Sequence, residues 1–288
     1  MYSRSITRNN RALIIIAIDQ SCSMAGEVKS MGRTFTKADM LSEVVNDLIS
    51  ELVERSRRSD GVRDYYDIAI VGYSGEGVTP LLGAGDTPWR SIVDIASLSV
   101  DEVTLEREYI LPNGEHRFLS HRCRCWIRPK AVGSTPMYEA LLSSHEIAEM
   151  WCAKSENRES FPPMIFNVTD GESTDCDYSD IAEIASRIKA ISTHDGAALL
   201  INVHIASDSA ARSMLFPSLA EMAVGGESSL AALSLFHSSS ELPPIFMDAV
   251  SQIKGSEQGV ALKAMSYNCS ISELITILNI GSISVKRG

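Results

Sequence analysis

The sequence predicts an α/β fold: a doubly wound, mostly parallel sheet with helices on both faces, plus a β-hairpin insertion. Two observations carry this prediction. Short continuous apolar runs alternate with stretches in which apolar residues recur every three or four positions, as buried parallel strands alternate with amphipathic helices. Two of the apolar runs also end in an aspartate, and ligands in such folds bind at the carboxyl ends of the strands.

The first part of the chain contains a strand, a helix and two further strands. Residues 12–18 form a continuous, β-branched run that is typical of a central strand covered on both faces. Apolar residues at helical spacing over 40–53 predict a helix, and Thr36 with Asp39 forms a capping pair in front of it. The two further expected strands are 66–73 and 78–82.

Residues 84–130 are irregular and are expected to be an insertion on the domain surface. The Pro-Asn-Gly run at 112–114 separates two extended stretches, which indicates a hairpin. His121, Cys123 and Cys125 alternate, so they share one face of a strand, and they are zinc-type ligands. Because C-x-C is less typical of structural zinc sites than C-x₂₋₄-C, a hairpin face with reduced thiols remains the alternative.

Regular alternation resumes after the insertion. Thr135 and Pro136 open a helix, since proline is favoured at the first helical position. Isoleucines at helical spacing over 181–191 predict the next helix. The remaining expected elements are a strand at 164–169, a strand at 197–205, a helix at 210–223, a loop at 237–244, and a last helix from Ser270 to about 280.

Size and composition indicate one ordinary globular domain. The 288 residues are expected to form a single domain over 10–288 behind a tail at 1–9, because an α/β domain with an insertion reaches this length. Hydrophobic residues make up 44% of the chain and charged residues 22%. The six cysteines are too sparse for a secreted disulfide scaffold, so most are expected to be reduced.

The net charge and the N-terminal sequence argue against several classes of function. A formal net charge of -11 argues against non-specific binding to nucleic acid or to anionic membranes, which depends on basic surfaces. The apolar run at 12–18 lacks the cleavage site of a signal peptide, and no stretch approaches the ~20 apolar residues that cross a bilayer. We therefore expect a cytoplasmic protein without a membrane or nucleic-acid partner.

Five oxygen-bearing side chains are candidates for a common site. Asp19 and Asp170 end two predicted strands, Ser21 and Ser23 follow the first strand, and Thr135 begins a helix between them. Because the carboxyl ends of parallel strands meet at one edge of a sheet, these residues can converge. Two carboxylates and three hydroxyls are hard oxygen donors that suit Mg²⁺, with Mn²⁺ or Ca²⁺ as possible alternatives.

Three stretches that carry these residues resemble the von Willebrand factor A (VWA) family. DQSCS resembles its D-x-S-x-S motif, GSTPMYEAL its threonine motif and NVTDGES its second aspartate motif, in the order of the family. The resemblance covers about 10–205, and NCSISELITILNIGS also resembles the last helix of bacterial TerY-like members. Cys22 stands where the family often has glycine, and the insertion is a larger departure.

The resemblance implies a Rossmann-like VWA fold with a metal-ion-dependent adhesion site. In that family Ser21, Ser23 and Thr135 would bind the ion directly, and Asp19 and Asp170 largely through water. The implied function is a protein-binding module whose metal accepts an Asp or Glu of a partner. The implied setting is a bacterial stress-response, defence or phosphorylation-signalling system, with a kinase, phosphatase or AAA+ ATPase as partner.

Two other functions remain open at this point. A strand that ends in aspartate beside Mg²⁺ also describes haloacid-dehalogenase phosphotransferases, in which that aspartate is the nucleophile. Those enzymes carry a second carboxylate two residues later, where this chain has Ser21, and serine cannot act as their acid or base. The remaining alternative is a structural subunit in which the metal site is vestigial.

Overall fold

The computed structural model describes residues 2–30, 33–82, 85–110, 116–205, 213–224, 230–254, 260–269, 273–274 and 276–277, without the side chains at 29–30, 33, 105–110, 116–119 and 121. One sheet dominates this part of the chain, in the order β15-β16-β14-β11-β1-β6-β7, with β8 paired to β6. Its strands are β1 (Ala12–Asp19), β6 (Tyr66–Ser74), β7 (Gly77–Pro80), β8 (Arg90–Ser91), β11 (Met164–Thr169), β14 (Leu199–Ile205), β15 (Met214–Leu215) and β16 (Met265–Cys269).

The sheet is mostly parallel, as predicted. The strands β6, β1, β11, β14 and β16 pair in parallel, whereas β7, β8 and β15 pair antiparallel at its edges. The strand β1 lies centrally between β6 and β11, and all eight of its residues are buried. A central strand covered on both faces explains its unbroken apolar sequence.

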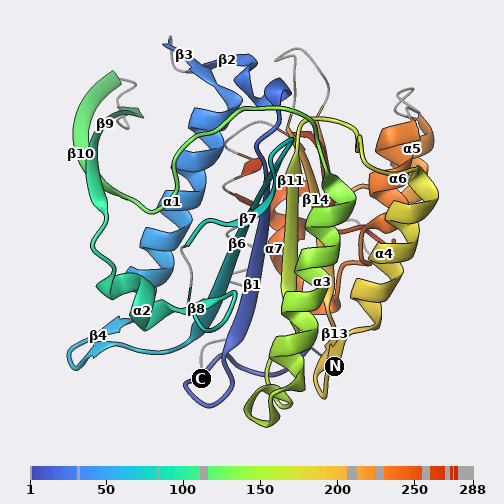
Figure 1. Cartoon of the computed structure of the whole chain (residues 1–288), viewed down its shortest axis with the longest axis horizontal. Helices are drawn as coiled ribbons and strands as arrows, with labels where there is room; N and C mark the ends of the chain where they lie inside the picture. Colours follow the sequence, from blue (N-terminus) through green and yellow to red (C-terminus); the bar gives the residue numbers. More distant parts are fainter. Residues whose placement is uncertain are drawn as a thin grey trace.

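Helices cover both faces of the sheet (Figure 1). On one face lie α1 (Lys37–Ser56), α2 (Ile92–Ser97) and α7 (Pro244–Lys254). On the other lie α3 (Met137–Ala153), α4 (Tyr178–Ala190) and α6 (Leu230–Ser238). Ile14 and Ile16 of β1 belong to the first apolar cluster and Leu13 and Ile15 to the second. Each such buried side chain contributes about 1.5–3 kcal/mol, so β1 ties the two layers together.

The predicted elements before the insertion are confirmed, with small shifts of their ends. The helix α1 begins after Thr36, whose hydroxyl accepts a hydrogen bond from the Asp39 N–H at 3.0 Å, while the Asp39 carboxylate accepts one from the Thr36 N–H at 3.1 Å. The structure adds short elements that the sequence pattern did not predict. They are β2 (Glu27–Ser30), β3 (Arg33–Thr36), β4 (Arg57–Arg58), β5 (Gly61–Val62) and the 3-10 helix η1 (Cys22–Ala25).

The region expected to be an irregular insertion contains the predicted hairpin. Its arms are β9 (Asp101–Ile110) and β10 (His116–Cys125), which pair antiparallel; the turn at 112–114 lies outside the described residues. Where the hairpin returns to the domain, the Asn46 side chain of α1 accepts hydrogen bonds from the N–H groups of Trp126 and Ile127 and donates to the Ile127 carbonyl, each at 2.9 Å. Two further elements here, β8 and α2, were not predicted.

The part after the insertion departs more from the prediction. Pro136 lies one residue before α3 as its N-cap, and not at the first helical position. The strand expected at 197–205 begins at Leu199, behind a small pairing of β12 (Ser192–Thr193) with β13 (Gly196–Ala197). The other short element is the 3-10 helix η2 (Ser155–Asn157).

Among the described residues, no helix combines the length and apolarity that a bilayer span requires.

The C-terminal elements were mostly missed. The expected helix at 210–223 is replaced, in its described part, by the edge strand β15 and the short helix α5 (Leu219–Val224). The expected loop at 237–244 is shorter, because α6 ends at Ser238 and α7 begins at Pro244. The elements α6, α7 and β16 had no counterpart in the prediction, and Ser270 lies outside the described residues. The four described residues at 273–274 and 276–277 are helical.

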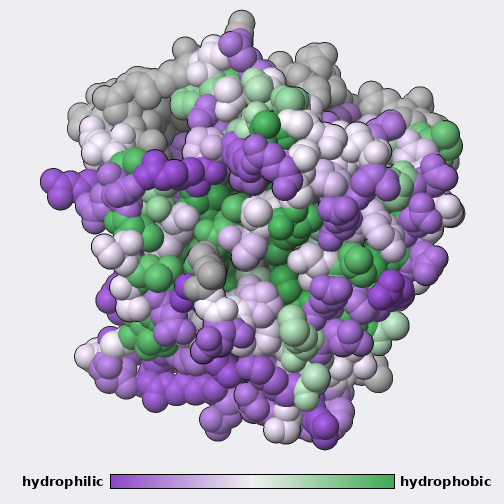
Figure 2. Space-filling model, viewed as in Figure 1, coloured by the Kyte–Doolittle hydropathy of each residue, from purple (hydrophilic) through white to green (hydrophobic). Residues whose placement is uncertain are grey.

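The surface near the edge strands β7 and β8 is more hydrophobic than the surface around it. Figure 1 places β7 and β8 between α1 and α3. In the same view, Figure 2 shows hydrophobic atoms gathered between these two helices, with hydrophilic atoms dominating the lower and outer parts of the face. The strands β7 and β8 pair with β6 at this edge of the sheet.

Candidate functional site

The site lies where β1 and β11 end. These neighbouring strands run in parallel with Ile18 opposite Val168, so Asp19 at the end of β1 and Asp170 just beyond β11 reach the same edge of the sheet. Both aspartates are buried, with 1% and 6% of their surface exposed. The chain after β1 turns directly into η1, which brings Ser23 back over the strand ends.

Four of the five predicted residues are joined by hydrogen bonds, three through their side chains and Asp19 through the Ser21 backbone. The hydroxyl oxygens of Ser21 and Ser23 are 2.9 Å apart, and the Ser23 hydroxyl donates to Oδ1 of Asp170 at 2.6 Å. The Asp19 Oδ1 accepts a hydrogen bond from the Ser21 N–H at 2.8 Å. Ser21 and Ser23 follow Asp19 at alternating positions, and their hydroxyls form one continuous cluster of oxygens with the two carboxylates.

The fifth residue, Thr135, lies between the two loops that form this cluster. Its N–H donates to the Thr174 hydroxyl at 2.9 Å, and its carbonyl accepts from the Thr174 N–H at 3.0 Å. On its other side, Gly133 exchanges hydrogen bonds with Cys22, through its carbonyl at 2.9 Å and its N–H to the sulfur at 3.0 Å. Among the described residues, the Thr135 hydroxyl has no hydrogen-bond partner, so it stays available to an external ligand.

Two glycines allow the loop that carries Gly133 and Thr135, the threonine loop, to approach the loop after β6. A Cβ on Gly75 would lie 2.8 Å from the Gly133 Cα, and a Cβ on Gly133 would lie 2.6 Å from the Gly75 Cα. Gly133 also has φ +71°, in the left-handed region that favours glycine. The sequence did not predict this contact, because the two glycines are far apart in the chain.

Lys37 is the member of the site that the sequence did not predict. Its ammonium Nζ lies 2.6 Å from Oδ2 of Asp170, and the two side chains are 4% and 0% exposed. The lysine is the first residue of α1, behind the Thr36 cap. A lysine at a helix N-terminus opposes the helix dipole, and this unfavourable position was the available signal that it serves another purpose.

Burial shifts the pKa of the groups around the cluster. Burial raises the pKa of Asp19, while hydrogen bonds from Ser21 and Thr169 lower it and the Asp170 charge raises it; the Thr169 hydroxyl donates to Oδ2 of Asp19 at 2.7 Å. Burial also lowers the pKa of His204 to about 4, against the opposing effect of Asp170. His204 is therefore neutral at pH 7, and two carboxylates with one ammonium give the cluster a net charge of about -1 when both acids are ionised.

The donor set fits a hard divalent cation. The oxygens of two carboxylates and three hydroxyls suit Mg²⁺ better than soft metals. The described residues contain no group of three or more His, Cys, Asp and Glu placed for a metal ion; this cluster has two such residues, so its fit depends on its hydroxyls. The zinc hypothesis for His121, Cys123 and Cys125 depends in part on the His121 side chain, which the structure does not describe. The Cys125 thiol donates to the Ile127 carbonyl at 3.3 Å.

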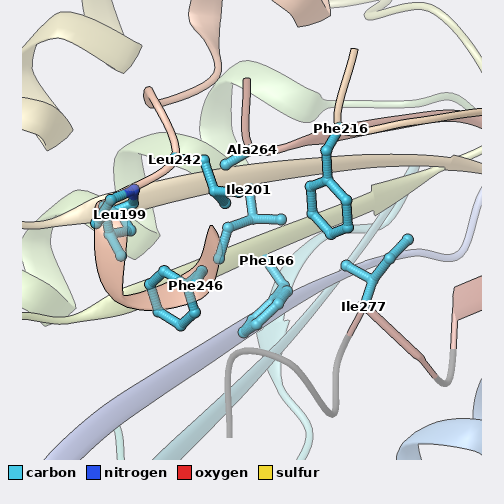
Figure 3. A pocket seen from close by; sticks show the side chains of 9 residues that line it. Phe166, Leu199, Ile201, Phe216, Leu242, Phe246, Ala264 and Ile277 are labelled. Carbon is cyan, nitrogen blue, oxygen red and sulfur yellow. The ribbon is translucent and has the colours of Figure 1, made fainter. Parts of the chain in front are cut away.

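A separate cavity lies in the core between the sheet and α7. Its volume is about 20 Å³, and its lining is apolar, including Phe166, Phe216, Phe246 and Ile277 (Figure 3). A cavity of this size has room for about one water molecule, but an apolar lining provides no hydrogen bonds to hold it. We regard this cavity as a packing defect of the core and not as a ligand site.

Comparisons with known proteins give matches at the level of structure. No protein-family model and no curated protein matches the sequence. A von Willebrand factor type A structure from Catenulispora acidiphila aligns with TM-score 0.41 and 16% identity, over 69% of this chain and 34% of that chain. The vWF domain of the type V pili tip protein Mfa5 from Porphyromonas gingivalis aligns with TM-score 0.41 and 11% identity, over 97% of both chains. The chain thus spans about a third of the first of these proteins.

Proposed function

We propose that this protein is a divalent-cation-dependent protein-binding module. Asp19, Ser21, Ser23, Thr135 and Asp170 would hold Mg²⁺, or alternatively Mn²⁺ or Ca²⁺. Bound there, the ion would supply a positive charge that accepts an Asp or Glu side chain of a partner protein. The single observation that carries the proposal is the hydrogen-bonded chain of oxygens from Ser21 through Ser23 to Asp170 at the shared end of β1 and β11.

The surrounding residues hold these donors in place. Asp19 receives hydrogen bonds on both carboxylate oxygens, from the Ser21 N–H and the Thr169 hydroxyl. Such partners orient a carboxylate, and their loss typically lowers the metal affinity of a site about 10–100-fold. Thr135 is fixed by its backbone alone, through Thr174, which leaves its hydroxyl for the ion.

The same geometry favours binding over catalysis. A phosphotransferase of the kind considered above needs an acid or base two residues after the nucleophilic aspartate. Ser21 occupies that position, and its hydroxyl already contacts the Ser23 hydroxyl. A serine hydroxyl does not exchange protons near neutral pH without an adjacent base. We therefore propose a binding module that is not an enzyme. The alternative is a structural subunit with a vestigial metal site, and metal binding in a titration would reject it.

The proposal extends to the biological setting of the module. The motif resemblance suggests a cytoplasmic component of a bacterial stress-response, defence or phosphorylation-signalling system. A kinase, phosphatase or AAA+ ATPase of the same system would be the partner. The formal charge of -11 disfavours nucleic acid and anionic membranes as alternatives, and a cation-dependent site would let an acidic protein recognise an acidic group.

The substitution Thr135→Val tests the proposed metal site. Valine removes the hydroxyl and keeps the shape, and the backbone hydrogen bonds to Thr174 remain. We expect Mn²⁺ binding, followed by the electron paramagnetic resonance signal of the free ion, to weaken about tenfold or more. Thermal unfolding of the metal-free protein should change little.

The matched control for this experiment is Ser74→Ala. Ser74 ends β6 at the same edge of the sheet, and its hydroxyl accepts a hydrogen bond from the Glu76 N–H at 3.3 Å, but it is not among the proposed donors. Mn²⁺ should bind this variant as it binds the wild type. Equal Mn²⁺ binding by the wild type and Thr135→Val would contradict the proposed donor set.

A further inference from the structure

Lys37 occupies a position that helix stability does not explain. It begins α1, where the helix dipole disfavours a cation. Its side chain is 4% exposed, although lysine is almost never buried to this degree without a partner. Removing an ammonium from water costs several kcal/mol unless a close carboxylate compensates it. The partner that supplies this compensation is Asp170, one of the proposed metal donors.

The path of the side chain leads past Gly26 into the oxygen cluster. The Gly26 N–H donates to the Ser23 carbonyl, and the Lys37 N–H donates to the Gly26 carbonyl, both at 2.9 Å. A Cβ on Gly26 would lie 3.4 Å from Cε and 3.6 Å from Nζ of Lys37 and 3.0 Å from the Ser23 carbonyl oxygen. The loop that carries Ser23 therefore also lines the route by which the ammonium reaches Asp170.

Both carboxylate oxygens of Asp170 have partners inside the chain. Oδ1 accepts from the Ser23 hydroxyl and Oδ2 from the Lys37 ammonium, each at 2.6 Å. The ammonium is therefore a cation already placed on a carboxylate that the proposed ion would also use.

We propose that Lys37 is a built-in cation that competes with the divalent ion for Asp170 and thereby sets the metal affinity of the site. This inference rests on the proposed function. Without a divalent ion, the ammonium neutralises Asp170 and ties the start of α1 to the end of β11. With the ion present, two positive charges act on one buried carboxylate, so Lys37 weakens binding and must share or leave Asp170.

Replacement of Lys37 by methionine separates this role from a purely structural one. Lys37→Met keeps the unbranched, flexible stem and removes the charge. Loss of a positive charge this close to the site should tighten Mg²⁺ binding about tenfold or more in calorimetric titration of EDTA-treated protein. A lysine that only ties α1 to β11 predicts unchanged or weaker binding, because loosening the loops harms the donor geometry.

Lys130→Met is the matched control. Lys130 pairs with Glu76 at 2.7 Å and its side chain is 35% exposed, so the same substitution removes the same charge from a solvated position. Screening by water and salt should keep the Mg²⁺ affinity of this variant within about twofold of the wild type. Equal tightening in both lysine variants would assign the effect to net charge and overturn the specific role of Lys37.

Thermal unfolding provides the second readout. Without metal, Lys37→Met leaves the buried Asp170 carboxylate without a charged partner, so the Tm of this variant should fall below that of the wild type. Saturating Mg²⁺ should raise the Tm of this variant by more than it raises that of the wild type, because the ion replaces the missing charge. If Lys37→Met does not fold, Lys37→Gln, which keeps an N–H donor without the charge, provides the same comparison.

The outcomes distinguish the two proposals. Tighter Mg²⁺ binding in Lys37→Met, with the larger Tm gain, supports both of them. Equal Mg²⁺ affinity in the wild type and Lys37→Met overturns the competition and leaves the metal site standing. Absence of Mg²⁺ binding in both proteins, with no Tm gain, overturns the metal site and the competition together.

Discussion

At the scale of single residues, the site combines two buried carboxylates with one buried ammonium. Asp170 is compensated by Lys37 and Ser23, whereas Asp19 relies on neutral donors, the Ser21 N–H and the Thr169 hydroxyl. This difference agrees with the raised pKa of Asp19, which burial causes and which its hydrogen bonds offset in part. The carboxylate without an internal cation is therefore the one that most needs an external one.

A pH prediction belongs to His204, which stacks on Tyr267 with ring centroids 4.5 Å apart. Burial lowers its pKa to about 4 from 6.5, so between these values the unfolded chain binds more protons than the folded one. This contribution to stability is complete above pH 6.5 and is lost as the pH falls towards 4, by up to about 3 kcal/mol.

The substitution His204→Asn tests this prediction. The side-chain oxygen of asparagine can accept the hydrogen bond that the Asn268 N–H now donates to Nδ1 of His204 at 3.4 Å, while the titrating ring is lost. Urea unfolding in EDTA at pH 6.5 and pH 4.5 should show a smaller loss of unfolding free energy in the variant than in the wild type. Equal losses in the two proteins would contradict the role of His204.

The residue scale also shows what sequence reasoning can reach. Asp19 and Asp170 were predictable because each directly follows an apolar run, and Ser21 and Ser23 because they follow one of them. Lys37 was not, because its contact with Asp170 joins α1 to a loop 133 residues away. Hydrophobic periodicity predicts that a lysine at the start of a helix is exposed to solvent. Only the folded arrangement of the loops shows that Lys37 has a buried partner.

At the scale of elements, the loops after β1, β6 and β11 all bond to the threonine loop before α3 and hold it at the site. The loop after β1 bonds to the threonine loop through Cys22 and Gly133, and the Gly75 N–H donates to the Val132 carbonyl at 3.3 Å. The threonine loop bonds in turn to Thr174 beyond β11. The loop after β6 and the threonine loop approach each other most closely at Gly75 and Gly133, where a side chain on either residue would collide with the other backbone.

The substitution Gly133→Ala should disturb this junction. Its positive φ and the 2.6 Å approach to Gly75 predict a loss of about 1–3 kcal/mol in unfolding free energy, with weaker Mn²⁺ binding because Thr135 moves. Urea unfolding and the Mn²⁺ resonance signal measure the two effects.

Gly61→Ala is the control for that experiment. Gly61 also has a positive φ, +117°, but a Cβ there meets nothing within 4 Å. It should therefore lose about 1 kcal/mol from backbone strain alone, with unchanged Mn²⁺ affinity. Normal Mn²⁺ binding by Gly133→Ala would contradict the role of the glycine contact in placing Thr135.

At the scale of the whole molecule, the topology places all five predicted donors at one edge of a single sheet. The long apolar runs of β1, β6, β11 and β14 made this architecture predictable. The C-terminal part was less predictable: β15 has two residues, and the described part of β16 carries Ser266 and Asn268 among its five. Strands this short and polar take their structure from the neighbours they pair with, which a local pattern does not contain.

The most direct test of the central claim, that this edge of the sheet binds a divalent cation, is calorimetric titration of Mg²⁺ and Mn²⁺ into EDTA-treated protein, with Asp19→Asn alongside. Asparagine keeps the size of the side chain and an acceptor oxygen for Ser21 or Thr169, and removes the charge. We expect saturable binding at one site in the wild type and its loss in Asp19→Asn. Binding of equal strength in the wild type and Asp19→Asn would contradict the proposed metal site. Absence of binding in both the wild type and Lys37→Met would contradict it as well.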